Sequence, residues 1–477
     1  MKNKVINSVG IDIGTTTSQV IFSSLELVNR AAPTQVPRYE FIDRKILHQS
    51  RLFFTPLNED GAINEKKLTD FILNEYTEAG FKHNEVETGA IIITGETSKA
   101  QNAKNTLMKL ADSLGDFVVA VAGPHLESII AGKGSGSAAY SEEKNKLVMN
   151  IDIGGGTSNF VVFKNGRVID TCCVNVGSRL IQIDEKGSVK KVAGPAKQII
   201  RYLFPEYREN YTNLSMNDLK RICEYMSEII VECISGTTES ILSRSLMMTP
   251  SLKQKYIPDA LFISGGVGEC YYNRPEYNNW FKFSDLGLLF ADALLLNDNF
   301  KKLKILKPKQ TIRATVIGAG AYTLSLSGST IWLGTEKLPI RNLPIIHPCL
   351  DWSDANASLS NGITESAQRL DIDLSKDDYA IYLQKDMPVN YKAVQSSADE
   401  ITKVYRKYRC KDNNPAIVLA YNDIGKVLGM VLEPRLHPRP LAVIDEVQTN
   451  EGDYIDIGKS YFGGEIVPLT IKSLAFP

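Results

Sequence analysis

Two short segments place an aspartate, glycines and hydroxyl residues in a pattern suited to binding phosphate and Mg²⁺. IDIGTTTSQVIF begins at Ile11 and IDIGGGTSNFVVF begins at Ile151, and each runs from an apolar strand through a turn of small residues into a second strand. Such a turn brings backbone N–H groups and hydroxyls close to phosphate oxygens, while the aspartate can hold a hydrated Mg²⁺. The two segments therefore indicate a nucleotide site.

The two loops together predict a clamp that holds one triphosphate from both sides. Asp12 and Asp152 are the predicted metal ligands, and both count as catalytic residues because they would face the same ion. The predicted phosphate-binding residues are Gly14, Thr15, Thr16, Thr17, Gly154, Gly155, Gly156 and Thr157. One IDIG alone is a weak signal, since IDIGKS from Ile455 has the same letters and indicates only a strand and a turn.

A third segment, LFISGGVGE from Leu261, runs from an apolar strand into paired glycines. Because glycine has no Cβ, Gly265 and Gly266 would let the backbone pass close to a flat base or a ribose, with Val267 beside them. The alternative is an ordinary turn between a strand and a helix. Its place after the second phosphate loop favours an adenosine pocket.

Two further segments are rich in small residues: PHLESIIAGKGSGSAA from Pro124 and VIGAGAYTLSLSG from Val316. Glycine and alanine on facing helices allow close approach of two backbones, which could form a pivot between two lobes. Tight packing without motion is the alternative for either segment. Lys133 could contact phosphate, or it could be a solvated lysine in a glycine-rich turn.

The elements that must position these residues form a duplicated α/β protein. At 477 residues the chain is long enough for about two to four domains, and the repeat of the IDIG segment indicates two related lobes. A helix is expected near residues 66–79, and strands are expected at 90–94 and 117–122. The predicted parts are lobe I (1–150, with an insertion at about 23–89), lobe II (151–330, with a mainly helical insertion at about 179–259) and an added, largely separate mixed α/β module (331–477).

The composition excludes several classes of partner. Lysine plus arginine (54) balance aspartate plus glutamate (55), so no general positive field would attract nucleic acid or anionic lipid. No apolar run is long enough to span a membrane, and no secretory signal is recognisable at the N-terminus, so a cytoplasmic protein is expected. The seven cysteines form no C-x-x-C pair, and adjacent Cys172 and Cys173 are read either as residues alternating across a strand or as ligands of a shared iron-sulfur cluster.

In their order along the chain, the five segments resemble the phosphate 1, connect 1, phosphate 2, adenosine and connect 2 motifs of the actin, hexokinase and Hsp70 superfamily. The resemblance implies two ribonuclease H-like lobes of the actin-like ATPase class that close over Mg²⁺ and ATP. It also implies that Glu127 stands where relatives orient the attacking water. A glutamate in a first helical turn is equally explained by the helix dipole. No counterpart of the catalytic lysine of Hsp70 is recognisable, which favours slow ATP turnover.

A more specific resemblance lies outside these loops, in RKILHQSRLFFTPL near Arg44, IIITGETSKAQNAK from Ile91, FVVAVAGPHLESIIAGKGSGS from Phe117 and the terminal DYIDIGKSYFGGEIVPLTIKSLAFP. These segments are similar to the reactivating factors of ethanolamine ammonia-lyase, from the first strand to the C-terminus. That family implies an ATP-dependent chaperone that releases damaged cobalamin from the inactivated lyase, so that intact adenosylcobalamin can bind again. A homodimer and an association with the ethanolamine microcompartment are compatible with it.

Two other functions stay open at this point. The first is a small-molecule kinase or phosphatase of the same fold, although a sugar kinase would need a carboxylate base near a substrate hydroxyl and no motif marks one. The second is an iron-sulfur ATPase activator of another radical enzyme, with Cys172 and Cys173 as ligands.

Overall fold

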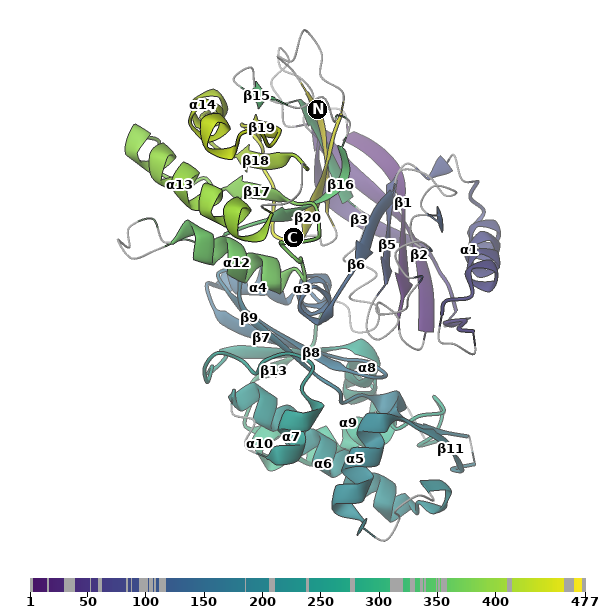
Figure 1. The fold of residues 1–477 in the computed structure, drawn as a ribbon. Helices are drawn as coiled ribbons and strands as arrows, with labels where there is room; N and C mark the ends of the chain where they lie inside the picture. The colour runs from purple at the N-terminus through teal and green to yellow at the C-terminus, as the bar shows by residue number, and fades with distance from the viewer. Residues whose placement is uncertain are drawn as a thin grey trace.

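The structure is a computed structural model in which three parts, each built on its own β-sheet, lie against one another (Figure 1). We call them lobe I, lobe II and the C-terminal module. The described residues are 3–14, 17–29, 39–51, 53–58, 62–82, 85–86, 88–93, 102, 106, 109–110, 117–184, 186–205, 211–236, 240–274, 279–308, 321–326, 331–334, 338, 340–348, 350, 352, 358–409, 414–458 and 467–473. Within these ranges, no helix combines the length and apolar character needed to cross a membrane.

Lobe I contains a six-stranded sheet in the order β3-β2-β1-β5-β6, with β4 paired to β2. Its strands are β1 (Asn3–Ile13), β2 (Thr17–Asn29), β3 (Tyr39–Gln49), β4 (Phe53–Phe54), β5 (Thr88–Ile93) and β6 (Phe117–Val121). β1 is antiparallel to β2 and parallel to β5, and β5 is parallel to β6. The expected strands near 90–94 and 117–122 are therefore confirmed within one or two residues.

Helix α1 (Glu65–Ala79) covers one face of this sheet. The Asn64 side chain accepts a hydrogen bond from the Lys67 N–H at its start, and Gly80 ends it in the left-handed conformation. Its buried residues share one core cluster with the alternate residues Val9 and Ile13 of β1. The helix predicted near residues 66–79 is confirmed.

Lobe II repeats the topology of lobe I. Its sheet has the order β13-β12-β7-β8-β9, from strands β7 (Leu147–Ile153), β8 (Ser158–Lys164), β9 (Arg167–Val174), β12 (Ala260–Ser264) and β13 (Ile305–Leu306). In both lobes the first strand is central, with an antiparallel hairpin on one side and two parallel strands on the other. This repeat confirms the predicted α/β class and the predicted duplication of the lobes.

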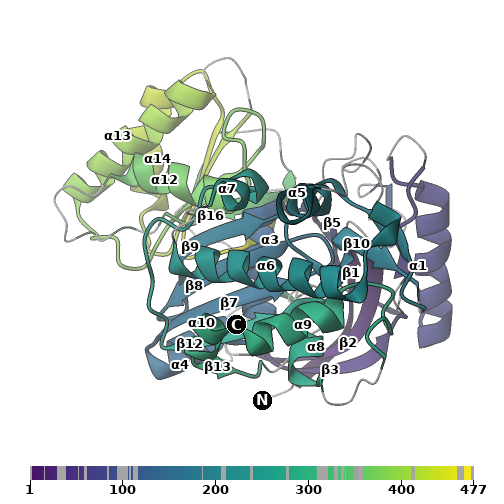
Figure 2. The ribbon, with the colours of Figure 1, turned by 90° about the horizontal axis from the view of Figure 1, so that it is seen from below.

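Helices cover both faces of the lobe II sheet. Those between β9 and β13 are α5 (Gly194–Leu203), α6 (Met216–Ser235), α7 (Ile241–Leu246), α8 (Gly265–Tyr272), α9 (Gly287–Leu296) and α10 (Asp298–Lys301), with a hairpin of β10 (Ile181–Ile183) and β11 (Val189–Val192). Figure 2 shows α6 and α9 lying across the sheet, and one large core cluster joins them to it. A capping box at Ser215 and Asp218 starts α6. The mainly helical character predicted for 179–259 is confirmed.

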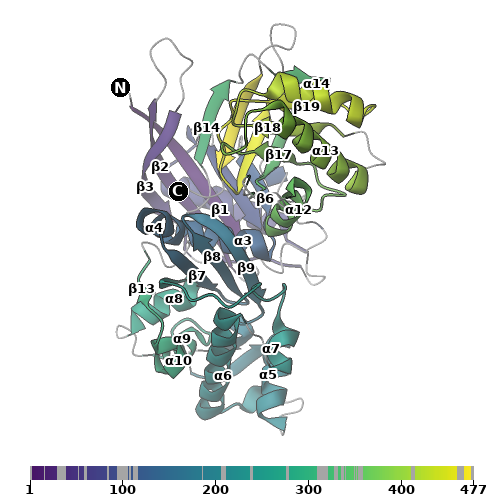
Figure 3. The ribbon, with the colours of Figure 1, turned by 90° about the vertical axis from the view of Figure 1, so that its left-hand side faces the viewer.

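The C-terminal module has an eight-stranded mixed sheet in the order β14-β21-β20-β16-β17-β18-β19-β15. Its elements are β14 (Ala321–Leu326), β15 (Trp332–Leu333), β16 (Ile340–Ile346), α12 (Leu359–Arg369), β17 (Ala380–Leu383), α13 (Tyr391–Tyr408), β18 (Ala416–Ala420), α14 (Gly425–Leu436), β19 (Leu441–Ile444), β20 (Asp453–Ile457) and β21 (Pro468–Ser473). Strands β16 to β19 are parallel, and the three helices pack on one face of them (Figure 3). The first three residues of the third IDIG, Ile455–Ile457, lie in β20, so the strand expected there is confirmed.

The connect 2 prediction is wrong for the residues that the structure describes. Residues 316–320 and 327–328 lie outside them, but Ala321–Leu326 form strand β14, which pairs antiparallel with β21 and contacts β3 and β5 of lobe I. The described residues AYTLSL combine the helix formers alanine and leucine with tyrosine and threonine, which favour strands, so the pairing with a distant strand decides their conformation. The facing-helix pivot expected from these residues is therefore absent from the described part of the segment.

Candidate nucleotide-binding site

The two IDIG loops occupy equivalent positions in the two sheets. In lobe I the loop joins β1 to β2, and Asp12 lies opposite Gln19 in their antiparallel ladder. In lobe II the loop joins β7 to β8, and Asp152 lies opposite Asn159. Each aspartate thus stands one residue before the end of the central strand of its sheet, as the sequence pattern predicts.

The lobe I loop is supported by a hydroxyl from the insertion of that lobe. Thr55 donates its hydroxyl hydrogen to the carbonyl oxygen of Gly14 at 2.7 Å, and its oxygen lies 3.0 Å from that of Ser18. Thr15 and Thr16 lie outside the described residues, and so does the side chain of Thr17. Their predicted contacts with phosphate remain predictions.

The lobe II loop is supported by backbone. The carbonyl oxygen of Gly154 accepts the N–H of Ser178, and that of Gly155 accepts the N–H of Arg179 at 2.6 Å. The Gly154 N–H in turn donates to the carbonyl of Thr157. An added Cβ at Gly156 would meet nothing within 4 Å, so this glycine faces open space. The loop is fixed from behind while its front stays accessible to a ligand.

Asp152 is buried and belongs to a chain of hydrogen bonds. The Ser264 hydroxyl donates to its carboxylate at 2.6 Å, and the Asn150 amide donates to the Ser264 oxygen at 3.0 Å. Burial raises the pKa of Asp152, while the bond from Ser264 opposes the rise. A bound divalent cation would favour the ionised form and act in the same direction as Ser264.

The predicted adenosine segment lies directly beside the lobe II loop. Gly265 opens helix α8 with φ +84°, and an added Cβ would be 2.4 Å from the carbonyl oxygen of Ile153. Glycine is therefore required here by the neighbouring strand β7. Gly266 faces open space, whereas the Val267 side chain is completely buried in the core of lobe II. Any contact of Val267 with a nucleotide would have to be through its backbone.

Glu127 lies in the first turn of α3 (Pro124–Gly134), which follows β6 directly and leads into α4 (Ser137–Lys144). The ends of β1, β5 and β6 are in register, since Ile13 pairs with Ile93 and Ile93 with Val121. With neighbouring strands about 4.8 Å apart, α3 begins roughly 10 Å from the lobe I loop. This edge is compatible with the predicted role of Glu127 near the phosphates.

Lys133 does not reach the phosphate loops. It lies in the last turn of α3, where its Nζ donates to the carbonyl oxygen of Glu451 in the C-terminal module at 2.6 Å. Neither of the two alternatives for this residue, phosphate contact or free solvation, is therefore correct. A glycine-rich sequence does not show which distant segment will cover the end of its helix.

Comparison with known proteins decides the family. The profile of a family described as ethanolamine utilisation protein EutA matches residues 4–477. The chain belongs to the EutA family. It is 49% identical to the ethanolamine ammonia-lyase reactivase EutA of Salmonella typhimurium and 47% identical to that of Escherichia coli K12, each over 100% of both chains. Among solved structures, the Aquifex aeolicus PPX-GPPA enzyme matches 58% of this chain and 74% of its own, with 16% identity and a TM-score of 0.34.

The structure of this EutA-family chain adds two amides that the sequence reasoning missed. Gln19 Oε1 and Asn159 Oδ1 are buried and have no hydrogen-bond partner among the described residues, and they lie opposite Asp12 and Asp152. A buried polar atom without a partner costs about 1–3 kcal/mol, and a ligand or a water that supplies the missing hydrogen bond removes this cost. The signal in the sequence was their shared position, seven residues after each aspartate.

A third missed residue, Arg179, lies between the lobes. Its guanidinium is over the Phe54 ring of lobe I at 5.4 Å, and its Nε lies 3.3 Å from the carboxylate of Asp285. Its backbone supports the lobe II loop at Gly155. The side chain thus brings a positive charge to the boundary between the two lobes beside a phosphate loop. No motif marks it, because its partners come from distant segments.

The two adjacent cysteines lie within the protein interior. Cys172 and Cys173 are consecutive residues of β9, and each is only 1% exposed. Burial raises the pKa of Cys172, which favours the neutral thiol over the thiolate that a metal cluster needs. These positions support the interpretation of two residues packed on opposite faces of a strand.

Proposed function

We propose that this chain is a reactivase of ethanolamine ammonia-lyase, which uses Mg²⁺ and ATP to release damaged cobalamin from the inactivated enzyme. The observation that carries the proposal is the similarity to the two curated reactivases, which extends over the full length of both chains. A likeness limited to the nucleotide lobes would support ATP binding alone. Here the C-terminal module is included as well.

The nucleotide site is the part of the proposal that the geometry supports. We infer that Asp12 and Asp152 hold Mg²⁺ from opposite lobes, with the loops after them around the phosphates. The two aspartates fit Mg²⁺, because this ion favours a few carboxylate ligands and keeps several of its waters. The orphaned oxygens of Gln19 and Asn159 could accept hydrogen bonds from such waters. When bound, Mg²⁺ would supply positive charge that neutralises the phosphate oxygens.

The residues around the nucleotide would then contribute by holding groups in fixed positions. Ser264 keeps the Asp152 carboxylate in one orientation, the Gly154 to Gly156 turn presents backbone to the phosphates, and Arg179 places a cation at the boundary of the lobes. We propose that Glu127 orients the attacking water. ATP would favour one arrangement of the two lobes, and the difference in client affinity between the arrangements limits how far the cobalamin pocket can be opened.

The proposal is tested with the inactivated client. Ethanolamine ammonia-lyase holoenzyme inactivated by turnover is incubated with this protein, Mg²⁺, ATP and fresh adenosylcobalamin, and both deamination and released cobalamin are measured. We expect recovery only when protein, ATP and Mg²⁺ are all present, and no recovery with ADP or with excess chelator. Absence of recovery, together with phosphorylation of a small metabolite, would instead favour a kinase.

Assembly is a separate part of the proposal. We propose a homodimer in solution and an association with the ethanolamine microcompartment, both compatible with the family. Light scattering coupled to size exclusion would give the mass of the particle, which for a dimer is about twice the 52.9 kDa of the chain. A monomeric mass at micromolar concentration would contradict the dimer without affecting the reactivase proposal.

A further inference from the structure

Helix α3 lies where all three parts of the molecule meet (Figures 1 and 3). It follows β6 of lobe I, packs on β7, β8 and β9 of lobe II and contacts α12 of the C-terminal module. One hydrophobic cluster contains Ile92 of lobe I, Phe163 of lobe II and Leu370 of the module, together with buried residues of α3. The C-terminal module is therefore not the largely separate unit expected from the sequence, because it shares a core with both lobes.

The N-terminus of α3 has no capping side chain of its own. Its N-cap residue is Gly123, followed by Pro124 at the first helical position. The carboxylate of Asp371 takes the capping role, since it accepts the N–H of Leu126 at 2.9 Å and also that of His125. An added Cβ at Gly123 would lie 2.3 Å from the Asp371 carboxyl carbon. The cap is thus supplied from 245 residues away in the chain, into space that only glycine leaves open.

Asp371 is held in a defined position at the end of α12. It has φ +55°, its N–H donates to the Gln368 carbonyl, and the N–H of Ile372 donates to the Ala367 carbonyl at 2.9 Å. These two bonds form a Schellman motif, in which glycine is the usual residue at the left-handed position. An aspartate in this conformation is strained and persists where its surroundings fix it. One residue therefore ends α12 and caps α3.

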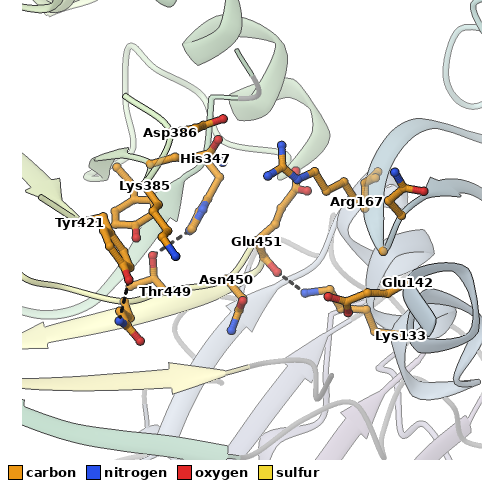
Figure 4. Close-up of a pocket in the computed structure, with 16 residues that line it drawn as sticks. Lys133, Glu142, Arg167, His347, Lys385, Asp386, Tyr421, Thr449, Asn450 and Glu451 are labelled. Atoms are coloured by element: carbon orange, nitrogen blue, oxygen red, sulfur yellow. Dashed lines mark hydrogen bonds between the residues drawn. The ribbon is translucent and has the colours of Figure 1, made fainter. Parts of the chain in front are cut away.

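The other end of α3 is bound to the same part of the module. Lys133, in the last turn, donates to the Glu451 carbonyl oxygen (Figure 4). The Glu451 carboxylate pairs with Arg369 Nε at 3.0 Å, and the two side chains are only 11% and 13% exposed. Arg369 is the last residue of α12, two residues before Asp371. Both ends of α3 are thus connected to the C-terminal end of α12.

We propose that Asp371 is a positioning residue that couples the nucleotide state of the lobes to the C-terminal module through α3. Helix α3 begins at the sheet edge that carries the lobe I loop and carries Glu127 in its first turn, so a change in lobe closure displaces the helix terminus that Asp371 caps. The module follows because α12 and α3 are joined at both ends. This inference rests on the proposed reactivase function.

The test compares client affinity in two nucleotide states. The affinity of the protein for inactivated ethanolamine ammonia-lyase holoenzyme is measured with Mg·ATP and with Mg·ADP, in wild type, Asp371→Ala and Asp371→Asn. We expect the ratio of the two affinities to fall toward one in Asp371→Ala, by about fivefold or more, the lower end of typical allosteric couplings. The affinity for ATP itself should change less than about twofold, because Asp371 does not line the phosphate loops.

Asp371→Asn should keep the wild-type ratio of the two client affinities. Burial raises the pKa of Asp371 to about 7, so a neutral side chain that keeps its oxygen is a close substitute for the native cap. The matched control is Glu365→Gln, which removes the exposed ion pair of α12 with Lys253 of lobe II at 3.1 Å and leaves the α3 cap intact. It should leave the ratio unchanged.

Three outcomes would contradict the coupling through Asp371 or distinguish its failure from a failure of the proposed reactivase function. If Asp371→Ala is less stable but keeps the wild-type ratio, Asp371 is only a structural cap and the inference is wrong. If Asp371→Ala does not fold, Gly123→Ala replaces it, since its Cβ displaces the Asp371 carboxyl group, and a wild-type ratio in that variant also overturns the inference. If wild type itself fails to reactivate the lyase, the proposed function fails first.

Discussion

The two phosphate loops share one topology but are built differently. In lobe II, the parallel neighbour of Asp152 is Ser264, which donates a hydrogen bond to its carboxylate. In lobe I, the parallel neighbour of Asp12 is Ile92, a fully buried apolar residue. The lobe II loop consists of glycines supported by backbone, whereas the lobe I loop is rich in threonine and is supported by Thr55. The duplicated fold thus keeps the aspartate and changes what surrounds it.

This difference indicates a division of roles within the clamp. Asp152 has its orientation fixed by the Asn150 and Ser264 chain before any ligand binds. In lobe I the positions equivalent to Asn150 and Ser264 are occupied by Gly10 and Ile92, whose side chains carry no hydrogen-bond donor. We infer that the Asn150 and Ser264 chain makes the lobe II aspartate a preorganised part of the metal site.

Removing either carboxylate should have the largest effect. We expect Asp12→Ala and Asp152→Ala each to lower Mg·ATP-dependent reactivation about 100-fold or more, because loss of a metal ligand removes several kcal/mol of charge stabilisation. Circular dichroism should show an intact fold in both. Normal nucleotide turnover and reactivation in both variants would remove the clamp, and a large effect in only one lobe would show that the two aspartates are not equivalent.

Removing the support of Asp152 should have a smaller effect. Ser264→Ala leaves the carboxylate in place without its hydroxyl donor, and we expect Mg²⁺ affinity in the presence of ATP to fall about 10-fold, at the lower end of what loss of a supporting hydrogen bond costs a metal site. Isothermal titration measures it. Ile92→Val is the lobe I control at the equivalent position and should leave the affinity unchanged. Equal losses in both variants would contradict the preorganised role of lobe II.

The orphaned amides allow stability and binding to be separated. Gln19→Leu and Asn159→Leu each remove a buried oxygen without a partner, and Asn159→Leu also removes the long hydrogen bond of 3.4 Å from Asn159 Nδ2 to the Thr157 hydroxyl. We therefore expect the free energy of unfolding to change by no more than about 1 kcal/mol. Nucleotide affinity should fall about 10-fold if the oxygens serve the site. Urea unfolding and nucleotide titration measure the two quantities. Unchanged nucleotide affinity in both variants would mean that these oxygens have no role in binding.

The smallest expected effect is a pH dependence that belongs to lobe II. Because burial raises the folded-state pKa of Asp152 above its ordinary value of 3.8, the native state binds this proton more tightly than the unfolded state does. The stability that Asp152 contributes is therefore present at pH values below 3.8 and is lost as the pH rises through the folded-state pKa. The thermal unfolding temperature, measured from pH 4 upward, should fall in wild type relative to Asp152→Asn. Saturating Mg·ATP should make this fall smaller. Identical pH profiles for the two proteins would contradict it.

Several features of this protein follow from local sequence. Apolar residues with period two and turns of small residues specify the strand-loop-strand units around Asp12 and Asp152, and the repeat of that unit predicts the duplicated lobes. The helix expected near residues 66–79 is α1, and the structure shows that its neighbours Asn64 and Gly80 cap its two ends. These predictions succeeded because each depends on residues within a few positions of one another.

Only the tertiary structure decided which distant residues complete these units. Ser264 reaches Asp152 across 112 residues, Asp371 caps α3 from 245 residues away, and Lys133 binds a carbonyl 318 residues along the chain. The Gln19 and Asn159 positions are visible in the sequence, but only burial shows that their oxygens lack partners. Local spacing fixes strands and turns, whereas contacts between segments depend on how whole sheets and helices pack, which no short pattern encodes.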